Sequence, residues 1–185
     1  FCQHGFDEWA CTEDSRRARY KTPDPPWGAY HLWLREKGYE PEATMANGEK
    51  HFSPIQRAKL PAECQMAAFV AECSDRFIRE NEDRPWLLVF STFEPHPPFT
   101  GPHDGLYDGD EIPLGPTFMK YPEGHSRWKR VRADYYPTAP KNGNIVVEDL
   151  STAAGWRKQR AQYFGNVKII DDAVGVLVKA LEETG

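Results

Sequence analysis

Long apolar runs are scarce in this chain of 185 residues. The most apolar stretch is WLLVF at 86–90, far short of the roughly 20 residues that a helix needs to cross a bilayer. The sequence therefore predicts no membrane span. Excess positive charge is also lacking, because the formal net charge is −5. Nucleic-acid binding depends on a basic patch, so this balance argues against a nucleic-acid partner. We interpret the basic run RRAR at 16–19 as a solvated loop face.

Cysteine is sparse, and its spacing fits no zinc or redox motif. An even number of cysteines permits disulfides without requiring them. Cys64 and Cys73 lie on a predicted helix, too far apart along it to bond to each other. We interpret the cysteines as free or core residues; the four are Cys2, Cys11, Cys64 and Cys73. A glycine-rich phosphate loop and the order of a serine–histidine–aspartate triad are missing as well.

Apolar periodicity predicts two long helices. The first runs over 61–81, and the NEDRP segment ends it, because a residue before proline is pushed out of helical geometry. The second runs over 156–184. Its expected buried stripe is Tyr163, Val167, Ile170, Val174, Leu177 and Leu181. A shorter helix is expected over 30–37, where Gly38 stands in the usual position after a helix end.

The segment between the two long helices predicts a buried strand. WLLVFSTF at 86–93 is apolar without alternation, as in a strand covered on both faces. A helix, a tight turn and a buried strand form half of an α/β unit. The expected fold class is therefore α/β, with a mostly parallel sheet flanked by helices. Residues 100–150 show no sustained period and predict an irregular excursion, whose aromatic residues argue for order.

His96 is the candidate functional residue. It follows the expected strand within STFEPHPPF at 91–99, and ligands of open α/β sheets bind at the carboxyl ends of strands. Prolines at 95, 97 and 98 stiffen the backbone around the imidazole. Histidine can donate a proton or a hydrogen bond to an anionic oxygen, which requires fixed geometry. The alternative is a loop histidine that only caps backbone groups.

Other polar groups predict no metal site. The adjacent carboxylates Asp171 and Asp172 fall inside a predicted helix, where neighbours diverge by about 100° and cannot readily grip one ion. Cys73 falls on an apolar helix face and is interpreted as core. The remaining histidines are interpreted as surface or packing residues: His4, His31, His51, His103 and His125.

Several segments, taken in order, resemble the sulfatase family of the alkaline phosphatase superfamily. HGFDEW at 4–9 resembles the segment that follows the family's GKWHLG motif. The stretch from 60–78 through 84–102 is similar to the family's helix–strand–loop unit ending in PHxPF. RAQYFGNVKIIDDAVGVLVKALEETG at 160–185 resembles the helix that precedes the family's DHG metal-binding segment, and GDEIPLGPTF at 109–118 resembles its proline-bearing loop.

The resemblance implies a partial alkaline-phosphatase-like sandwich and the hydrolysis of sulfate esters. In the complete protein it implies a formylglycine nucleophile, made from Cys or Ser in a CxPSR-type motif, and a divalent cation, usually Ca²⁺. The implied partners are a sulfate-ester small molecule or a sulfated carbohydrate. His96 matches the PHxP histidine, which by resemblance contacts the sulfate or the leaving-group oxygen. His96 is thus both the catalytic and the substrate-binding candidate.

The chain departs from the family pattern in lacking the CxPSR, GKWHLG and DHG motifs and the paired early aspartates. We therefore interpret residues 1–185 as a partial domain that holds neither nucleophile nor metal and is inactive alone. A periplasmic or secreted location is favoured by the resemblance, although a cytoplasmic one stays open. Two alternatives stay open for the function: a phosphonate monoester or phosphodiester hydrolase of the same superfamily, and a non-catalytic carbohydrate- or protein-binding module using the aromatic-rich segment 94–136.

Overall fold

The computed structural model describes residues 5–12, 27–40, 44, 48, 50 and 58–185. The chain divides into two compact units, which are described separately: residues 1–94 with 169–185, and residues 95–168. Some residues considered in the sequence lie outside the described part, namely Cys2, His4, His51 and the basic run at 16–19. The described cysteines Cys11, Cys64 and Cys73 are free.

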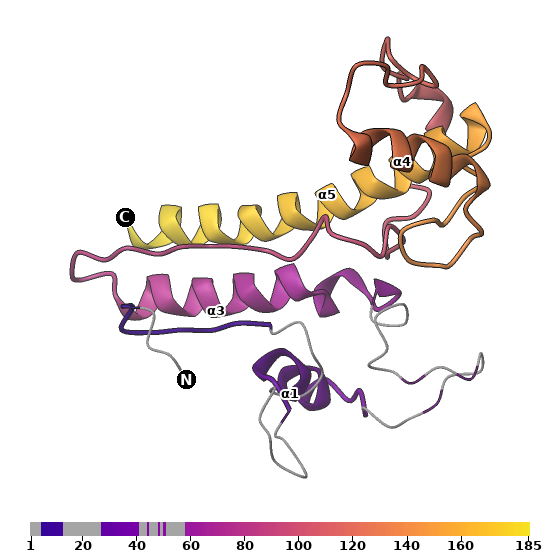
Figure 1. Ribbon diagram of the computed structural model, residues 1–185. Coiled ribbons are helices and arrows are strands. Elements are labelled where there is room, and N and C mark those ends of the chain that lie inside the picture. The colour runs from indigo at the N-terminus through magenta and orange to yellow at the C-terminus, as the bar shows by residue number, and fades with distance from the viewer. Residues whose placement is uncertain (1–4, 13–26, 41–43, 45–47, 49, 51–57) are drawn as a thin grey trace. The chain divides into compact units, whose positions relative to one another are not determined.

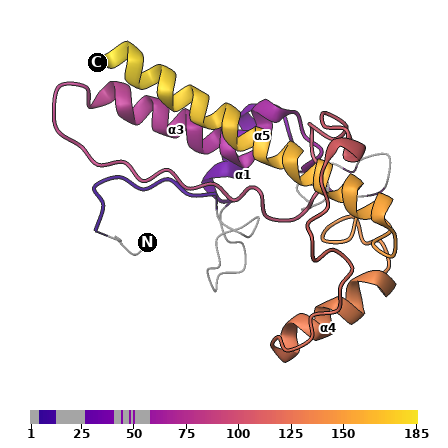
Figure 2. The same ribbon diagram turned by 90° about the horizontal axis from the view of Figure 1, so that it is seen from above.

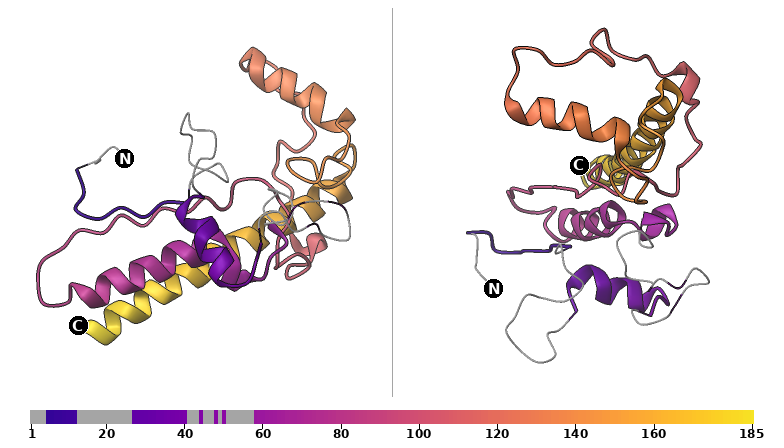
Figure 3. Two further views of the ribbon diagram at one scale, coloured as in Figure 1. Left: turned by 90° about the horizontal axis from the view of Figure 1, so that it is seen from below. Right: turned by 45° about the vertical axis from the view of Figure 1, so that its right-hand side comes forward.

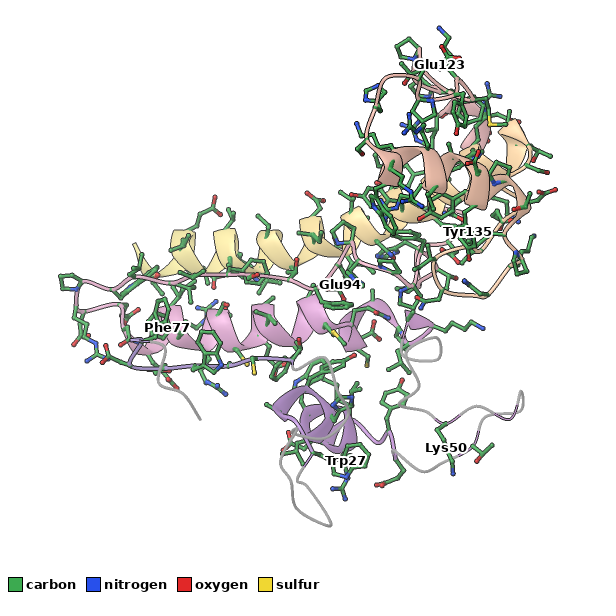
Figure 4. The ribbon with its side chains drawn as sticks, in the orientation of Figure 1. Trp27, Lys50, Phe77, Glu94, Glu123 and Tyr135 are labelled. Carbon is green, nitrogen blue, oxygen red and sulfur yellow. The ribbon has the colours of Figure 1, made fainter. Side chains whose placement is uncertain are left out.

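The first unit contains a small aromatic core around helix α1, which spans Ala29–Glu36. Its Tyr30 and Leu34 side chains are fully buried and pack against Phe69. Tyr30 Oη donates a hydrogen bond to the Cys64 carbonyl oxygen over 2.6 Å. Figure 3 shows α1 next to α3, and Figure 4 labels Trp27, which joins this core. The helix predicted here is confirmed to within one residue at each end.

The predicted helix over 61–81 is divided in two by Gln65. A short 3₁₀ helix, η1, spans Ala62–Cys64, and α3 spans Met66–Glu80. Gln65 has extended backbone angles, φ −76° and ψ 162°. Its side-chain amide donates to the Leu60 carbonyl oxygen over 2.6 Å. This buried amide holds the chain entry to α3, a feature that apolar periodicity does not reveal.

Helix α5 spans Ala153–Thr184 and packs through small residues. In the first unit its Ile169 and Ala173 lie against Ala67 and Ala71 of α3, as the adjacent helices in Figures 1 and 2 show. The predicted stripe is wrong at Tyr163, Val174 and Leu181, which are exposed. Its Leu177 is partly buried against the same cluster. Alanine at the contact lets two helices approach closely, whereas larger side chains at the same positions would hold them apart. No helix in the described part of the chain has the length and hydropathy that a membrane span requires.

The strand predicted over 86–93 is not confirmed. No described residue belongs to an extended strand, and Thr44 and Lys50 form only an isolated antiparallel bridge. Figure 1 shows the segment after α3 as an open trace running back along that helix. Its Leu87 and Val89 side chains are 75% and 63% exposed. A strand exists through hydrogen bonds to a neighbouring strand, and the described residues supply none.

The second unit contains one helix in the segment expected to be irregular. α4 spans Arg127–Tyr135 and leads into the 3₁₀ helix η3, Tyr136–Thr138. A further 3₁₀ turn, η2, spans Gly109–Glu111. None of the α4 residues is buried, so the helix has no apolar stripe from which periodicity could predict it. Its C-terminal side is anchored by Tyr136, whose ring packs against Trp156 at 6.1 Å.

Glu148 is a buried carboxylate that ties α5 to the segment before it. Lys158 Nζ lies 2.9 Å from its Oε1, and Lys141 Nζ lies 3.3 Å from its Oε2. Gln162 donates to Oε1 over 3.3 Å. Burial opposes ionisation of the carboxyl group, but hydrogen bonds from Lys158 and Lys141 outweigh it and hold the pKa of Glu148 below its ordinary value of 4.5.

We expect Glu148→Gln to destabilise the chain by about 2 kcal/mol at pH 7, because two lysine ammonium groups lose a charged acceptor. The pKa of Glu148 is lower in the folded state than in the unfolded state. Its stabilisation is therefore present above about pH 4.5 and is lost as the pH falls through the folded pKa. Urea unfolding at pH 7 and pH 3 should show the difference from wild type shrinking at the lower pH. The exposed Glu123→Gln is the control, and an equal loss at both pH values would contradict the assignment.

Candidate functional site

His96 lies on an exposed loop at the start of the second unit. Figure 4 labels Glu94, two residues before it. The His96 Nδ1 atom is 3.0 Å from the Pro97 carbonyl oxygen. A carbonyl oxygen only accepts, so a hydrogen bond here requires Nδ1 to carry the proton. The opposite ring atom, Nε2, is then the atom through which the exposed imidazole can act on a ligand.

The loop after His96 closes on itself through Asp104. The Thr100 hydroxyl donates to Asp104 Oδ2, and the Gly101 amide donates to Asp104 Oδ1 over 3.1 Å. The Asp104 amide in turn donates to the Gly101 carbonyl oxygen over 3.1 Å. One carboxylate therefore organises the turn by local side-chain-to-backbone bonds.

Helix α5 holds the same loop from one side. The buried Asn166 donates from Nδ2 to the Pro98 carbonyl oxygen over 3.1 Å. Beside it, a Cβ added to Gly165 would lie only 2.9 Å from the His103 carbonyl oxygen, so only glycine fits this approach. Aromatic pairs extend the contact outward: Phe99 with Tyr163 at 5.9 Å, and Tyr107 with Phe164 at 6.1 Å. Four consecutive residues of α5, 163–166, therefore contact the loop.

A second segment of the unit supports the loop through the backbone. The Phe99 amide donates to the Asn144 carbonyl oxygen over 3.0 Å. The segment that carries Asn144 is itself fixed to α5 by Gln159, whose Nε2 donates to the Ile145 carbonyl oxygen over 3.0 Å. Gln159 Oε1 accepts from the Val147 amide over 3.1 Å. The buried amide side chains of α5 thus position both segments.

Asp171, Asp172 and Cys73 belong to the first unit, whereas His96 belongs to the second, and each is described within its own unit. Asp171 and Asp172 are exposed within α5, as expected for helix carboxylates. Cys73 is partly buried in α3, and burial raises the pKa of its thiol. His103 belongs to the same loop as His96, and its backbone contacts Gly165.

Sequence reasoning missed Gly165 and Asn166. A signal was present, because Gly165 and Asn166, two weak helix formers, stand together inside a long helix. An isolated glycine in a helix costs stability and is often explained by a close approach of backbone, which is its role here.

The described residues do not fit a metal ion. Within them, no group of three or more histidine, cysteine, aspartate or glutamate side chains is placed to hold one. Resident divalent cations bind to sets of such oxygen or nitrogen ligands. The chemistry that these residues can supply is therefore that of an exposed imidazole held in a braced loop.

Comparison with known proteins gives two kinds of match. The model of the sulfatase family matches residues 1–185. Multifunctional alkaline phosphatase superfamily protein PehA from Trinickia caryophylli is 25% identical over 181 residues, covering 88% of this chain and 34% of that protein. Choline-sulfatase from Rhizobium meliloti (strain 1021) is 25% identical over 191 residues, covering 98% of this chain and 34% of that protein. The chain thus spans about a third of the length of these curated relatives.

We expect Gly165→Ala and Gly175→Ala, on the same helix, to have opposite effects. Replacing a helix glycine by alanine ordinarily stabilises by about 0.5–1 kcal/mol. Gly175 has nothing within 4 Å of an added Cβ and should show this gain. Gly165 should instead lose stability, because the added Cβ meets the His103 carbonyl group. Thermal melts of both variants measure the difference, and a gain in stability for Gly165→Ala would contradict the close approach.

Proposed function

Because the family model matches its whole length, the chain belongs to the sulfatase family, and we propose that it is part of a hydrolase that cleaves sulfate esters. The observation that carries the proposal is the exposed His96 in a loop fixed by α5. Family membership and the curated relatives, among them a choline-sulfatase, support a hydrolase of this kind. The substrate is a small sulfate ester or a sulfated carbohydrate.

In this proposal His96 acts on the ester through Nε2. With Nδ1 turned to the Pro97 carbonyl oxygen, a protonated Nε2 donates to a sulfate oxygen or to the oxygen of the departing alcohol. Donation to the departing oxygen stabilises the negative charge that develops as the sulfur–oxygen bond breaks. The fixed loop lowers the cost of orienting the ring at that moment.

By family resemblance, the complete protein would have a formylglycine nucleophile and a divalent cation, Ca²⁺. The formylglycine and the ligands of the cation would come from segments outside residues 1–185. The partial match supports this, since the chain spans about a third of its relatives. The exposed apolar side chains of Leu87 and Val89 support it too, because a soluble domain normally covers such a segment. His96 would then be this chain's contribution to a site completed by other segments.

A phosphonate monoester or phosphodiester hydrolase of the same superfamily is a second candidate. The relative described as a multifunctional alkaline phosphatase superfamily protein favours it. The same imidazole could donate to a phosphoryl oxygen, because phosphate and sulfate esters present similar anionic acceptors. Parallel assays of the full-length protein on 4-nitrophenyl sulfate and bis(4-nitrophenyl) phosphate distinguish these two candidates.

A non-catalytic binding module is a third candidate, and α4 favours it. Trp128 is 64% exposed, and the Arg132 guanidinium lies 5.2 Å from the centre of its ring. In the described part of the chain, none of the four α4 cations forms an ion pair with a carboxylate; these are Arg127, Lys129, Arg130 and Arg132. A ring between cations suits an anionic carbohydrate. This candidate predicts a monodisperse chain in size-exclusion chromatography and a cooperative melt, whereas a partial domain predicts aggregation.

In the full-length protein, His96→Asn should lower kcat for 4-nitrophenyl sulfate by about 10²–10⁴-fold, the usual contribution of a general acid. His96 is exposed, so the thermal melt should change little. His125→Asn, another exposed histidine, is the matched control and should keep its kcat. A His96→Asn protein with wild-type turnover would exclude the proposed role.

The isolated chain of residues 1–185 should not hydrolyse 4-nitrophenyl sulfate, and millimolar Ca²⁺ should not raise its melting temperature. A ligand that binds only the folded state raises that temperature, so no shift is expected where the described residues hold no ligand set. A magnesium titration run in parallel controls for general ionic effects. Measurable turnover, or a Ca²⁺-specific shift, would show that the chain carries its own catalytic metal site.

A further inference from the structure

The loop around His96 has an unusual shortage of hydrogen-bond donors. Pro95, Pro97 and Pro98 have no backbone N–H, so the residues flanking the imidazole cannot be fixed by donating to a neighbour. Their carbonyl groups remain as acceptors, and each needs a donor from elsewhere. The imidazole of His96 lies within hydrogen-bond distance of the Pro97 oxygen. The Pro98 oxygen takes its donor from α5.

We propose that Asn166 is a positioning residue for His96, acting through the Pro98 carbonyl group. Its side chain is 4% exposed and lies on α5, while its Nδ2 reaches a carbonyl two residues beyond the imidazole. Proline has a nearly fixed φ angle. The Pro98 carbonyl group belongs to the peptide bond between Pro98 and Phe99. Because the rings at 97 and 98 nearly fix two φ angles, holding this peptide restricts the backbone that leads back to His96, and with it the direction of the His96 side chain.

The neighbouring contacts make Asn166 the central point of this restraint. Gly165 brings the helix backbone against His103 in the same loop, with no room for a Cβ. The Phe99 amide, next after Pro98, donates to the Asn144 oxygen. These two contacts hold the residues on the C-terminal side of Pro98. The Asn166 amide is an α5 side chain that hydrogen-bonds to the 96–98 segment itself.

Asn166 is not explained by helix stability or by core packing alone. Asparagine is a weak helix former, and the residues on either side of it in α5 are glycine and valine. Burying an amide without a partner would cost about 1–3 kcal/mol, and the hydrogen bond to the Pro98 carbonyl oxygen offsets this cost.

The first test uses the full-length protein and does not depend on catalysis. Asn166→Leu keeps the number and branching of the side-chain heavy atoms and removes the donor, and Asn166→Ala is the smaller alternative should the leucine variant fail to fold. Either variant should speed hydrogen exchange of the Phe99 amide by about tenfold or more, since the loop opens locally, and should shift the His96 ring resonances in NMR spectra. The control is Asn81→Leu, which removes another buried amide donating to a carbonyl oxygen, at Phe77 in the other unit. Unchanged His96 resonances in the Asn166 variants would overturn the proposal.

The second test rests on the proposed function and uses the full-length protein. Asn166→Leu should lower kcat for 4-nitrophenyl sulfate by about tenfold to a hundredfold, the range expected for a displacement of about 1 Å, and leave KM within about twofold. Asn166→Gln keeps the amide donor and should recover part of kcat. Asn81→Leu should lower the melting temperature without this loss.

The outcomes of the two tests distinguish the positioning role of Asn166 from the proposed hydrolysis of sulfate esters. A shifted His96 signal with wild-type kcat would reduce Asn166 to a structural role and overturn the positioning inference. If the wild-type full-length protein lacks sulfatase activity, the proposed function fails, and the NMR comparison alone still decides whether Asn166 orients His96.

Discussion

The described second unit depends on one constraint, the close approach of α5 to a loop whose prolines at 95, 97 and 98 have no backbone N–H to donate. Proline-rich backbone is stiff within each residue but offers acceptors without donors. Such a loop keeps a fixed place only if another element supplies N–H groups and comes near enough to deliver them. The glycine at 165 removes the steric barrier, and the amide at 166 makes the bond.

The same helix uses small residues for a second purpose in the first unit. Ala173 packs against the alanines of α3, in a contact that large side chains would prevent. Small residues at helix interfaces let backbones come close, and the energy then comes from many weak contacts rather than from a few large side chains. The contact combines these small residues with Ile169 of α5. Other large apolar residues of the helix, such as Val174 and Leu181, are exposed in the described unit.

This explains how far the sequence could predict the structure. The end of α1 followed from Gly38, whose φ of +91° ends the helix as expected. The buried side of α5 did not, because hydrophobic periodicity gives weight to valine and leucine and overlooks alanine and glycine. α4 was not predicted for the opposite reason, because none of its residues is buried. The strand over 86–93 was read from composition, yet a strand also needs a partner that composition cannot supply.

The candidate site shows the same division between local and long-range information. His96 could be singled out because the residues that restrain it, three prolines of the same loop, are its neighbours in the sequence. Asn166 could not, since it lies 68 positions after the carbonyl it serves and looks like a defect in a helix. Defects of this kind carry a physical cost that must be offset by a contact. A buried asparagine next to a glycine inside a helix is therefore a reason to search for a backbone acceptor in a distant loop. A proline-rich loop is a good place to search, because it has many acceptors and few donors of its own.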